Sequence, residues 1–114
     1  MELMTAKRAD AETLKEICRL AADVKRVRFS RAAQYDMAAH HLTEADVRGK
    51  IIDWIGRGEP VKEVTIHSIP NLVGHSAYEI KPRMRNMLFY IKVALIELGR
   101  PGEHMLVIST HPDH

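Results

Sequence analysis

The spacing of apolar residues changes about halfway along the chain. In residues 10–56 the apolar positions recur every three or four residues, which is the spacing of helices that bury one face. In residues 61–110 apolar and polar residues tend to alternate, which is typical of strands with one buried face. A block of helices followed by a block of strands predicts an α+β fold, with N-terminal helices packed on one face of a C-terminal antiparallel sheet.

Three helices are predicted in the first half, each after a capping residue. Asp10 is expected to begin a helix that runs to about residue 24, and Ser30 one that runs to about residue 40. Thr43 begins the third helix, with Asp46 three positions later, which is the spacing of a capping box. This helix should end at residues 56–58, where glycine allows a left-handed backbone.

The second half predicts about four antiparallel strands joined by hairpins. Their expected ranges are residues 61–69, 76–81, 88–98 and 105–110, and a short extended piece is expected at residues 27–29. In the third of these strands Phe89 and Ile91 should face the helices. Because side chains alternate across a strand, Tyr90 and Lys92 then lie on the other, partly open face.

Length and composition indicate one globular domain, residues 1–114. The chain is 46% hydrophobic and 28% charged, which is ordinary for a soluble protein. Its single cysteine, Cys18, lies in an apolar helical stripe, so we expect a buried side chain and no disulfide. No apolar run has the length of a membrane span, and the first ten residues lack the hydrophobic stretch of a signal peptide. A cytoplasmic protein is predicted.

The open face of the sheet gathers side chains suited to chemistry on RNA. Tyr90 and Lys92 are expected there, together with His111 on the last strand and His67 on the first. Histidine exchanges protons near neutral pH, and cationic side chains stabilise charge that develops on phosphorus. When the 2′-hydroxyl of the RNA is the nucleophile, cleavage requires a base, an acid and such cations. We therefore predict a reaction that uses no metal and no cofactor.

Several segments, in collinear order, resemble the MqsR-type toxins of bacterial toxin–antitoxin pairs. Residues 78–96 are similar to the central strands of that family, where a Tyr-Arg-Pro-Arg segment leads at the same spacing into a Val-Tyr-Leu-Lys strand. Residues 106–111 resemble the family's last strand. Residues 14–17 and 27–32 resemble its first helix and the step that follows, so the resemblance covers nearly the whole chain.

This resemblance implies a RelE-like fold, endoribonuclease activity on single-stranded mRNA and neutralisation by a cognate antitoxin protein. The family's catalytic tyrosine falls on Tyr90, and its C-terminal catalytic lysine falls on His111. Its catalytic glutamine falls near Ala77, so His75 is the candidate replacement. The expected catalytic residues are His67, His75, Tyr90 and His111. The residues expected to bind RNA are Lys62, Tyr78, Arg83, Arg85 and Lys92.

Three other functions remain open on the residues alone. A catalytically inactive relative of the toxins would bind protein or RNA on the same open face. A metal protein would use histidines, but their spacing is not that of a metal site. These histidines are His40, His41, His67, His75, His104, His111 and His114. A helix-turn-helix built from the second and third helices would bind DNA, and the net charge of +2 permits it, but residues 47–55 are too apolar for a groove face.

Overall fold

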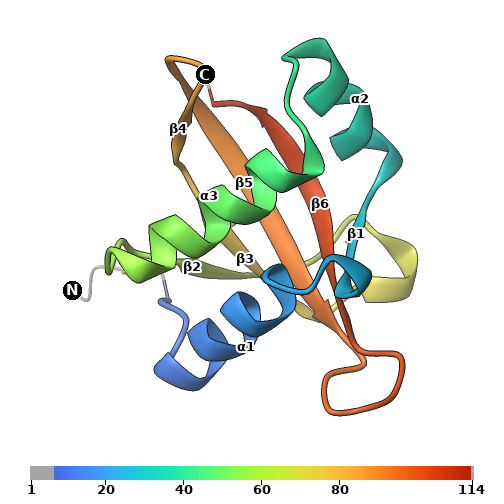
Figure 1. The fold of residues 1–114 in the computed structure, drawn as a ribbon. Coiled ribbons are helices and arrows are strands. Elements are labelled where there is room, and N and C mark those ends of the chain that lie inside the picture. The colour runs from blue at the N-terminus through green and yellow to red at the C-terminus, as the bar shows by residue number, and fades with distance from the viewer. Residues whose placement is uncertain (1–6, 114) are drawn as a thin grey trace, which may run out of the picture.

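The structure is a computed structural model that describes residues 7–113. This part of the chain forms three α-helices and a mixed six-stranded sheet (Figure 1), so the predicted α+β class is confirmed. The helices are α1 (Ala11–Ala21), α2 (Arg31–Ala39) and α3 (Glu44–Gly56), with single 3₁₀ turns η1 (Val24–Arg26) and η2 (Pro70–Leu72). The strands are β1 (Val27–Phe29), β2 (Lys62–Thr65), β3 (Ser76–Ile80), β4 (Arg83–Met84), β5 (Met87–Ile96) and β6 (His104–Pro112).

Each helix begins at the capping residue that the sequence predicts. The side chains of Asp10 and Ser30 accept hydrogen bonds from the backbone N–H three residues later, at 2.8 and 3.0 Å. Thr43 and Asp46 bind each other's backbone N–H at 3.0 and 2.9 Å, which completes the capping box. Beyond the end of α3, Gly58 has a φ of 74°. These contacts satisfy backbone groups that a helix end leaves unpaired.

The strand order is β1-β6-β5-β3-β2, and β4 forms a separate hairpin with β5. The prediction of a wholly antiparallel sheet is wrong at one edge, because β1 runs parallel to β6 with Val27 opposite Met105. A parallel pair requires a long crossover, and nearly the whole chain supplies it here. The alternation of residues 27–29 identified an extended piece, but such a local pattern carries no information about a partner so distant in sequence.

The β4–β5 hairpin turns through Arg85 and Asn86, which have φ values of 54° and 61°. Two central residues with positive φ are the geometry of a tight type I′ hairpin turn. The Arg85 guanidinium donates to the His41 carbonyl oxygen at 2.9 Å and lies 3.4 Å from the Asp46 carboxylate. The turn is thereby tied to the start of α3 on the helix side of the sheet.

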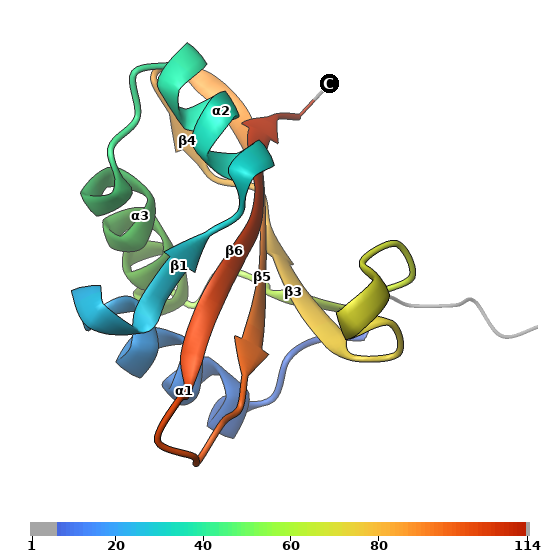
Figure 2. The ribbon, with the colours of Figure 1, turned by 90° about the vertical axis from the view of Figure 1, so that its right-hand side faces the viewer.

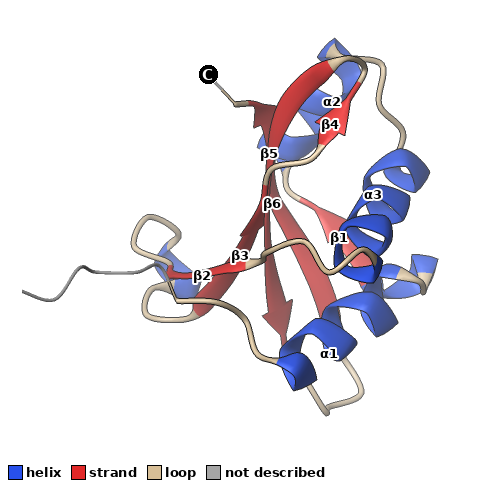
Figure 3. Ribbon diagram, turned by 90° about the vertical axis from the view of Figure 1, so that its left-hand side faces the viewer, coloured by secondary structure: helices blue, strands red, loops and turns tan. Residues whose placement is uncertain are grey.

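The helices lie on one side of the sheet, and the segment around η2 lies on the other (Figures 2 and 3). Phe89 and Ile91 of β5 are buried in the main core beneath the helices, as predicted, and Val93 is buried with them. A second, smaller cluster forms where the η2 segment covers the opposite face, around Ile66 and Ala94. The face without helices is therefore covered at one end and open at the other.

One expectation about the core needs correction. Cys18 is half-buried rather than buried, because it lies on the flank of α1 beside α3 instead of beneath the helix. Partial burial still raises the pKa of its thiol. Among the helices described in residues 7–113, none has the length and apolar character needed to cross a membrane.

Candidate functional site

The open end of the sheet carries a polar row contributed by neighbouring strands. On β5 and β6 Tyr90 lies opposite His111, and Lys92 lies opposite Ser109. The pair between them, Ile91 and Thr110, faces the helices and is buried. A register shift after Lys92 ends this polar row, and the apolar cluster under η2 begins beyond it. The predicted placement of Tyr90, Lys92 and His111 on one face is confirmed.

Tyr90 and His111 are in direct contact. Their rings stack with centroids 5.0 Å apart and planes 19° apart. The Nδ1 of His111 lies 2.9 Å from the carbonyl oxygen of Pro112. Because a carbonyl oxygen only accepts, Nδ1 carries the hydrogen in this bond, and Nε2 of the neutral ring keeps its lone pair. His111 is thus held in the tautomer that accepts a proton at Nε2.

Glu79 on β3 completes the row and was not among the predicted residues. The Tyr90 hydroxyl donates to the Glu79 carboxylate in a short hydrogen bond, and Lys92 Nζ lies 3.9 Å from the same oxygen. Burial, and then this bond and the charge of Glu79, raise the pKa of Tyr90 well above its ordinary value. Tyr90 therefore keeps its proton at neutral pH and acts as a hydrogen-bond donor, not as a base.

The alternation along β3 fixes the face of the sheet on which Glu79 lies, but not its neighbours. Ala77 and Glu79 lie on the face without helices, Ala77 beneath the η2 segment and Glu79 at the open end, while Tyr78 and Ile80 face the helices. Glu79 also lies directly opposite Lys92, and opposite charges in such a pair stabilise an antiparallel register. Finding Glu79 from the sequence would have required this register, which alternation alone does not supply.

His67 and His75 lie apart from this row. Both are exposed in the segment that joins β2 to β3. His75 precedes Tyr78 by three residues, and Tyr78 pairs with Val93, itself three residues beyond Tyr90. At about 3.3 Å per residue this places His75 roughly 20 Å along the sheet from Tyr90. The expectation that these two histidines join Tyr90 is therefore corrected, since alternation specifies a face but not a position along the strand.

Three of the predicted RNA-binding residues lie outside this row. Tyr78 is half-buried against the helix-side core, where burial raises the pKa of its hydroxyl. Arg83 and Arg85 line a hollow beside α3, where they share the surface with Asp46 and Lys50. The register places Arg83 opposite Leu88, and the tight turn places Arg85 beside the start of α3. Their role in binding RNA stays a prediction.

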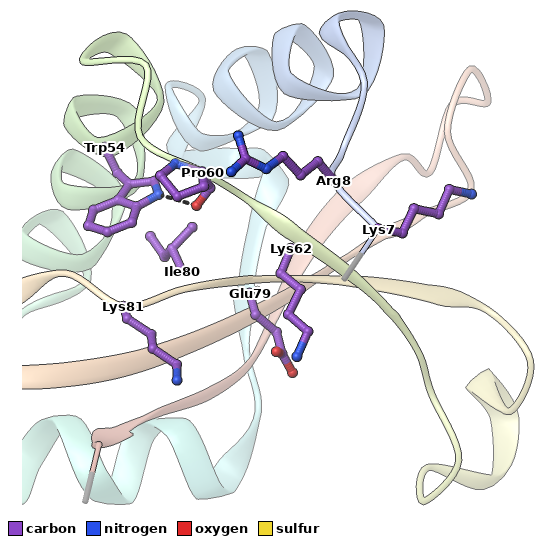
Figure 4. Close-up of a pocket in the computed structure, with 8 residues that line it drawn as sticks. All are labelled: Lys7, Arg8, Trp54, Pro60, Lys62, Glu79, Ile80 and Lys81. Carbon is purple, nitrogen blue, oxygen red and sulfur yellow. Dashed lines mark hydrogen bonds between the residues drawn. The ribbon is translucent and has the colours of Figure 1, made fainter. Parts of the chain in front are cut away.

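Lys62 does join the site, from the strand beyond Glu79. It lies opposite Glu79 in the β2–β3 pairing, and the two side chains extend to the same side (Figure 4). Lys81 follows β3 and lies 3.6 Å from the carboxylate of Asp113. The row therefore runs across the strands from His111 through Tyr90 and Glu79 to Lys62.

The candidate metal ligands do not come together in the part of the chain described. Among residues 7–113 no three His, Cys, Asp or Glu side chains are close enough to hold an ion. His114, which is one of the candidate ligands, lies outside the described residues. Comparisons of the chain with protein-family models, with curated proteins and with solved structures found no match.

Proposed function

We propose that the chain is a RelE-like endoribonuclease toxin that cuts single-stranded mRNA and is neutralised by a cognate antitoxin protein. One observation carries the proposal above all. Tyr90 contacts both His111 and Glu79, so a proton acceptor, a proton donor and a carboxylate from three adjacent strands lie side by side on the open face. The collinear resemblance to MqsR-type toxins supports the same function.

In the proposed reaction the RNA supplies its own nucleophile. The 2′-oxygen forms a bond to phosphorus while the bond from phosphorus to the 5′-oxygen of the next nucleotide breaks. The 2′-hydroxyl proton goes to a base, and the leaving 5′-oxygen receives a proton from an acid. The products are a 2′,3′-cyclic phosphate and a 5′-hydroxyl end.

The geometry favours one assignment of roles. Nε2 of His111 accepts the 2′-hydroxyl proton, because its Nδ1 hydrogen is held by the Pro112 carbonyl. Tyr90, which stays protonated, donates to the leaving oxygen. Lys92 lies near the Tyr90 ring, 6.0 Å from its centroid, and offsets the charge that builds on the phosphate. Glu79 is a positioning residue that orients the Tyr90 hydroxyl.

The test is cleavage of a single-stranded RNA oligonucleotide by the purified protein, with the new ends identified. His111→Ala and Tyr90→Phe should each lower the rate by about 10²–10⁴, which is what loss of one acid or base commonly costs. The matched controls are His104→Ala, at the other end of β6, and Tyr35→Phe, whose side chain is 77% exposed on α2. Both controls should cut like wild type.

Two results would contradict the proposal. The first is cleavage that His111→Ala and Tyr90→Phe leave within tenfold of wild type, because the row would then not carry the chemistry. The second is folded wild-type protein that cuts no RNA and, when induced in bacteria, leaves growth and mRNA intact. In that case co-expression of an antitoxin would have no growth defect to reverse.

One observation favours a second candidate, an inactive relative that binds RNA or protein. The family's catalytic glutamine falls near Ala77, which is fully buried and has no polar side-chain group. RNA binding without cleavage, unchanged by His111→Ala, would support this binding module.

A further inference from the structure

Beside the row, at the edge of the sheet, lies a hollow of about 450 Å³. It opens where residues 60–62 diverge from the end of β3, and Figure 4 shows the side chains around it. Its lining residues are Lys7, Arg8, Trp54, Pro60, Lys62, Glu79, Ile80 and Lys81. This volume is within the range of pockets that hold small organic ligands.

The lining combines an apolar part with a cationic one. Trp54, Pro60 and Ile80 form the apolar part, and the indole is fixed by a 2.9 Å hydrogen bond from Nε1 to the Pro60 carbonyl oxygen. Four cationic residues also line the hollow, against the single carboxylate of Glu79. An aromatic surface with cations around it suits a nucleotide, since the base stacks and the phosphate is neutralised.

Two of the four cations lack an ionic partner of their own. Lys7 pairs with Glu63 at 2.9 Å, and Lys81 pairs with Asp113 at 3.6 Å. Within residues 7–113 neither Arg8 nor Lys62 forms an ion pair. Both extend from adjoining backbone, because Arg8 bridges to Lys62 at the edge of β2. They are therefore available to a phosphate.

We infer that this hollow binds the base and phosphate of the RNA nucleotide next to the cleaved bond. The base packs on Trp54 and Ile80, and Lys62 and Arg8 contact the phosphate. Glu79 joins the two places, because it lines the hollow and its carboxylate accepts the Tyr90 hydrogen bond. The inference rests on the proposed function, because it places the hollow beside the reacting phosphate.

The chain carries its own reporter for this test, since Trp54 is its only tryptophan. The probe is a short single-stranded RNA with 2′-O-methyl groups, which binds but cannot be cut. Its binding should quench the tryptophan fluorescence, and a blunt RNA duplex of the same length should not. Trp54→Leu should weaken binding roughly 5- to 150-fold when a second label on the RNA is followed, which is the usual loss for one stacked base.

A second variant covers the case in which Trp54→Leu does not fold. Lys62→Ala changes an exposed side chain and removes one cation from the phosphate. It should weaken binding and reduce the slope of log Kd against log salt by about 0.7, which is the value for one neutralised phosphate on a single strand. The control is Lys25→Ala, an exposed lysine in η1 that does not line the hollow and should leave binding and salt dependence unchanged.

The outcomes separate this inference from the proposed function. One outcome is that Lys62→Ala and wild type cut RNA at the same rate and RNA binding does not change the tryptophan fluorescence. This outcome would contradict the nucleotide subsite but not the proposed nuclease activity. Quenching by the uncuttable RNA, with no cleavage of ordinary RNA, would support the subsite and overturn the nuclease.

Discussion

At the scale of single residues, the candidate site depends on the hydrogen bond that Tyr90 donates to Glu79. The hydroxyl of Tyr90 points at the carboxylate, and burial together with that charge raises the pKa of Tyr90. With its pKa raised in this way, the tyrosine hydroxyl stays protonated at neutral pH and can donate a hydrogen bond. Its stacking on His111 places the proton donor and the proton acceptor of the proposed reaction side by side.

Glu79→Gln should lower the pKa of Tyr90, because the amide keeps the size of the side chain but removes the negative charge. Following phenolate absorbance against pH, we expect one tyrosine to ionise at lower pH in the variant than in wild type. Cleavage should fall through kcat, with KM little changed, since Glu79 orients the donor. An unchanged Tyr90 titration would contradict the hydrogen bond on which this role depends.

The same residue scale shows what the sequence could and could not reveal about the site. Tyr90, Lys92 and His111 were placed on the correct face because alternation along a strand fixes the face on which each side chain lies. Glu79 and the hollow beside Trp54 were missed, since both depend on strand register and on the path of residues 60–62. No local pattern encodes either feature.

At the scale of elements, most boundaries were predicted because their causes are local. The three helix starts follow from side chains that bind backbone groups three residues away. The parallel partner of β1 was not predicted, because it lies 78 positions later, at Met105 for Val27. The short strand β4 was also missed, because its turn uses Arg85 and Asn86 instead of glycine.

One ion pair joins α1 to the turn before β6. Arg19 donates to both carboxylate oxygens of Glu103, at 2.7 and 2.9 Å, and the Gly99 backbone N–H adds a third hydrogen bond at 3.0 Å. Arg19, followed by the Gly99 bond, lowers the pKa of Glu103 to about 2. The contact fastens the long β5–β6 hairpin to the first helix.

This depressed pKa predicts a stability change in acid. An unfolded glutamate titrates at about 4.3, so the folded state holds fewer protons between that pH and about 2. The stabilising contribution of Glu103 is therefore complete above about pH 4.3 and is lost as pH falls through about 2. In Glu103→Gln, urea unfolding curves should show lower stability at pH 7 and a weaker decline in acid. Equal acid dependence in both proteins would contradict the pair.

At the scale of the whole molecule, the two faces of the sheet differ in what covers them. The helices cover one face and provide the main core, while the other face carries polar side chains at one end and the η2 cluster at the other. The site is thus built on the central strands β5 and β6, which the core holds rigid. The α+β class and the division into covered and open faces followed from the sequence, because hydrophobic periodicity reports burial directly.

In the strand order β1-β6-β5-β3-β2, the two edge strands come from the first part of the chain, and the strands between them come from the second part. A break in the exposed backbone between His67 and Ser68 would leave one fragment with both edge strands and the helices, and another with Glu79, Tyr90 and His111. Neither fragment has a complete core, so we expect them to be unstable apart and to reassemble when co-expressed. Co-purification through a tag on one fragment measures this, and failure of the fragments to associate would contradict it. The two fragments would then form a complementation pair, in which the complete candidate site exists only after the fragments associate.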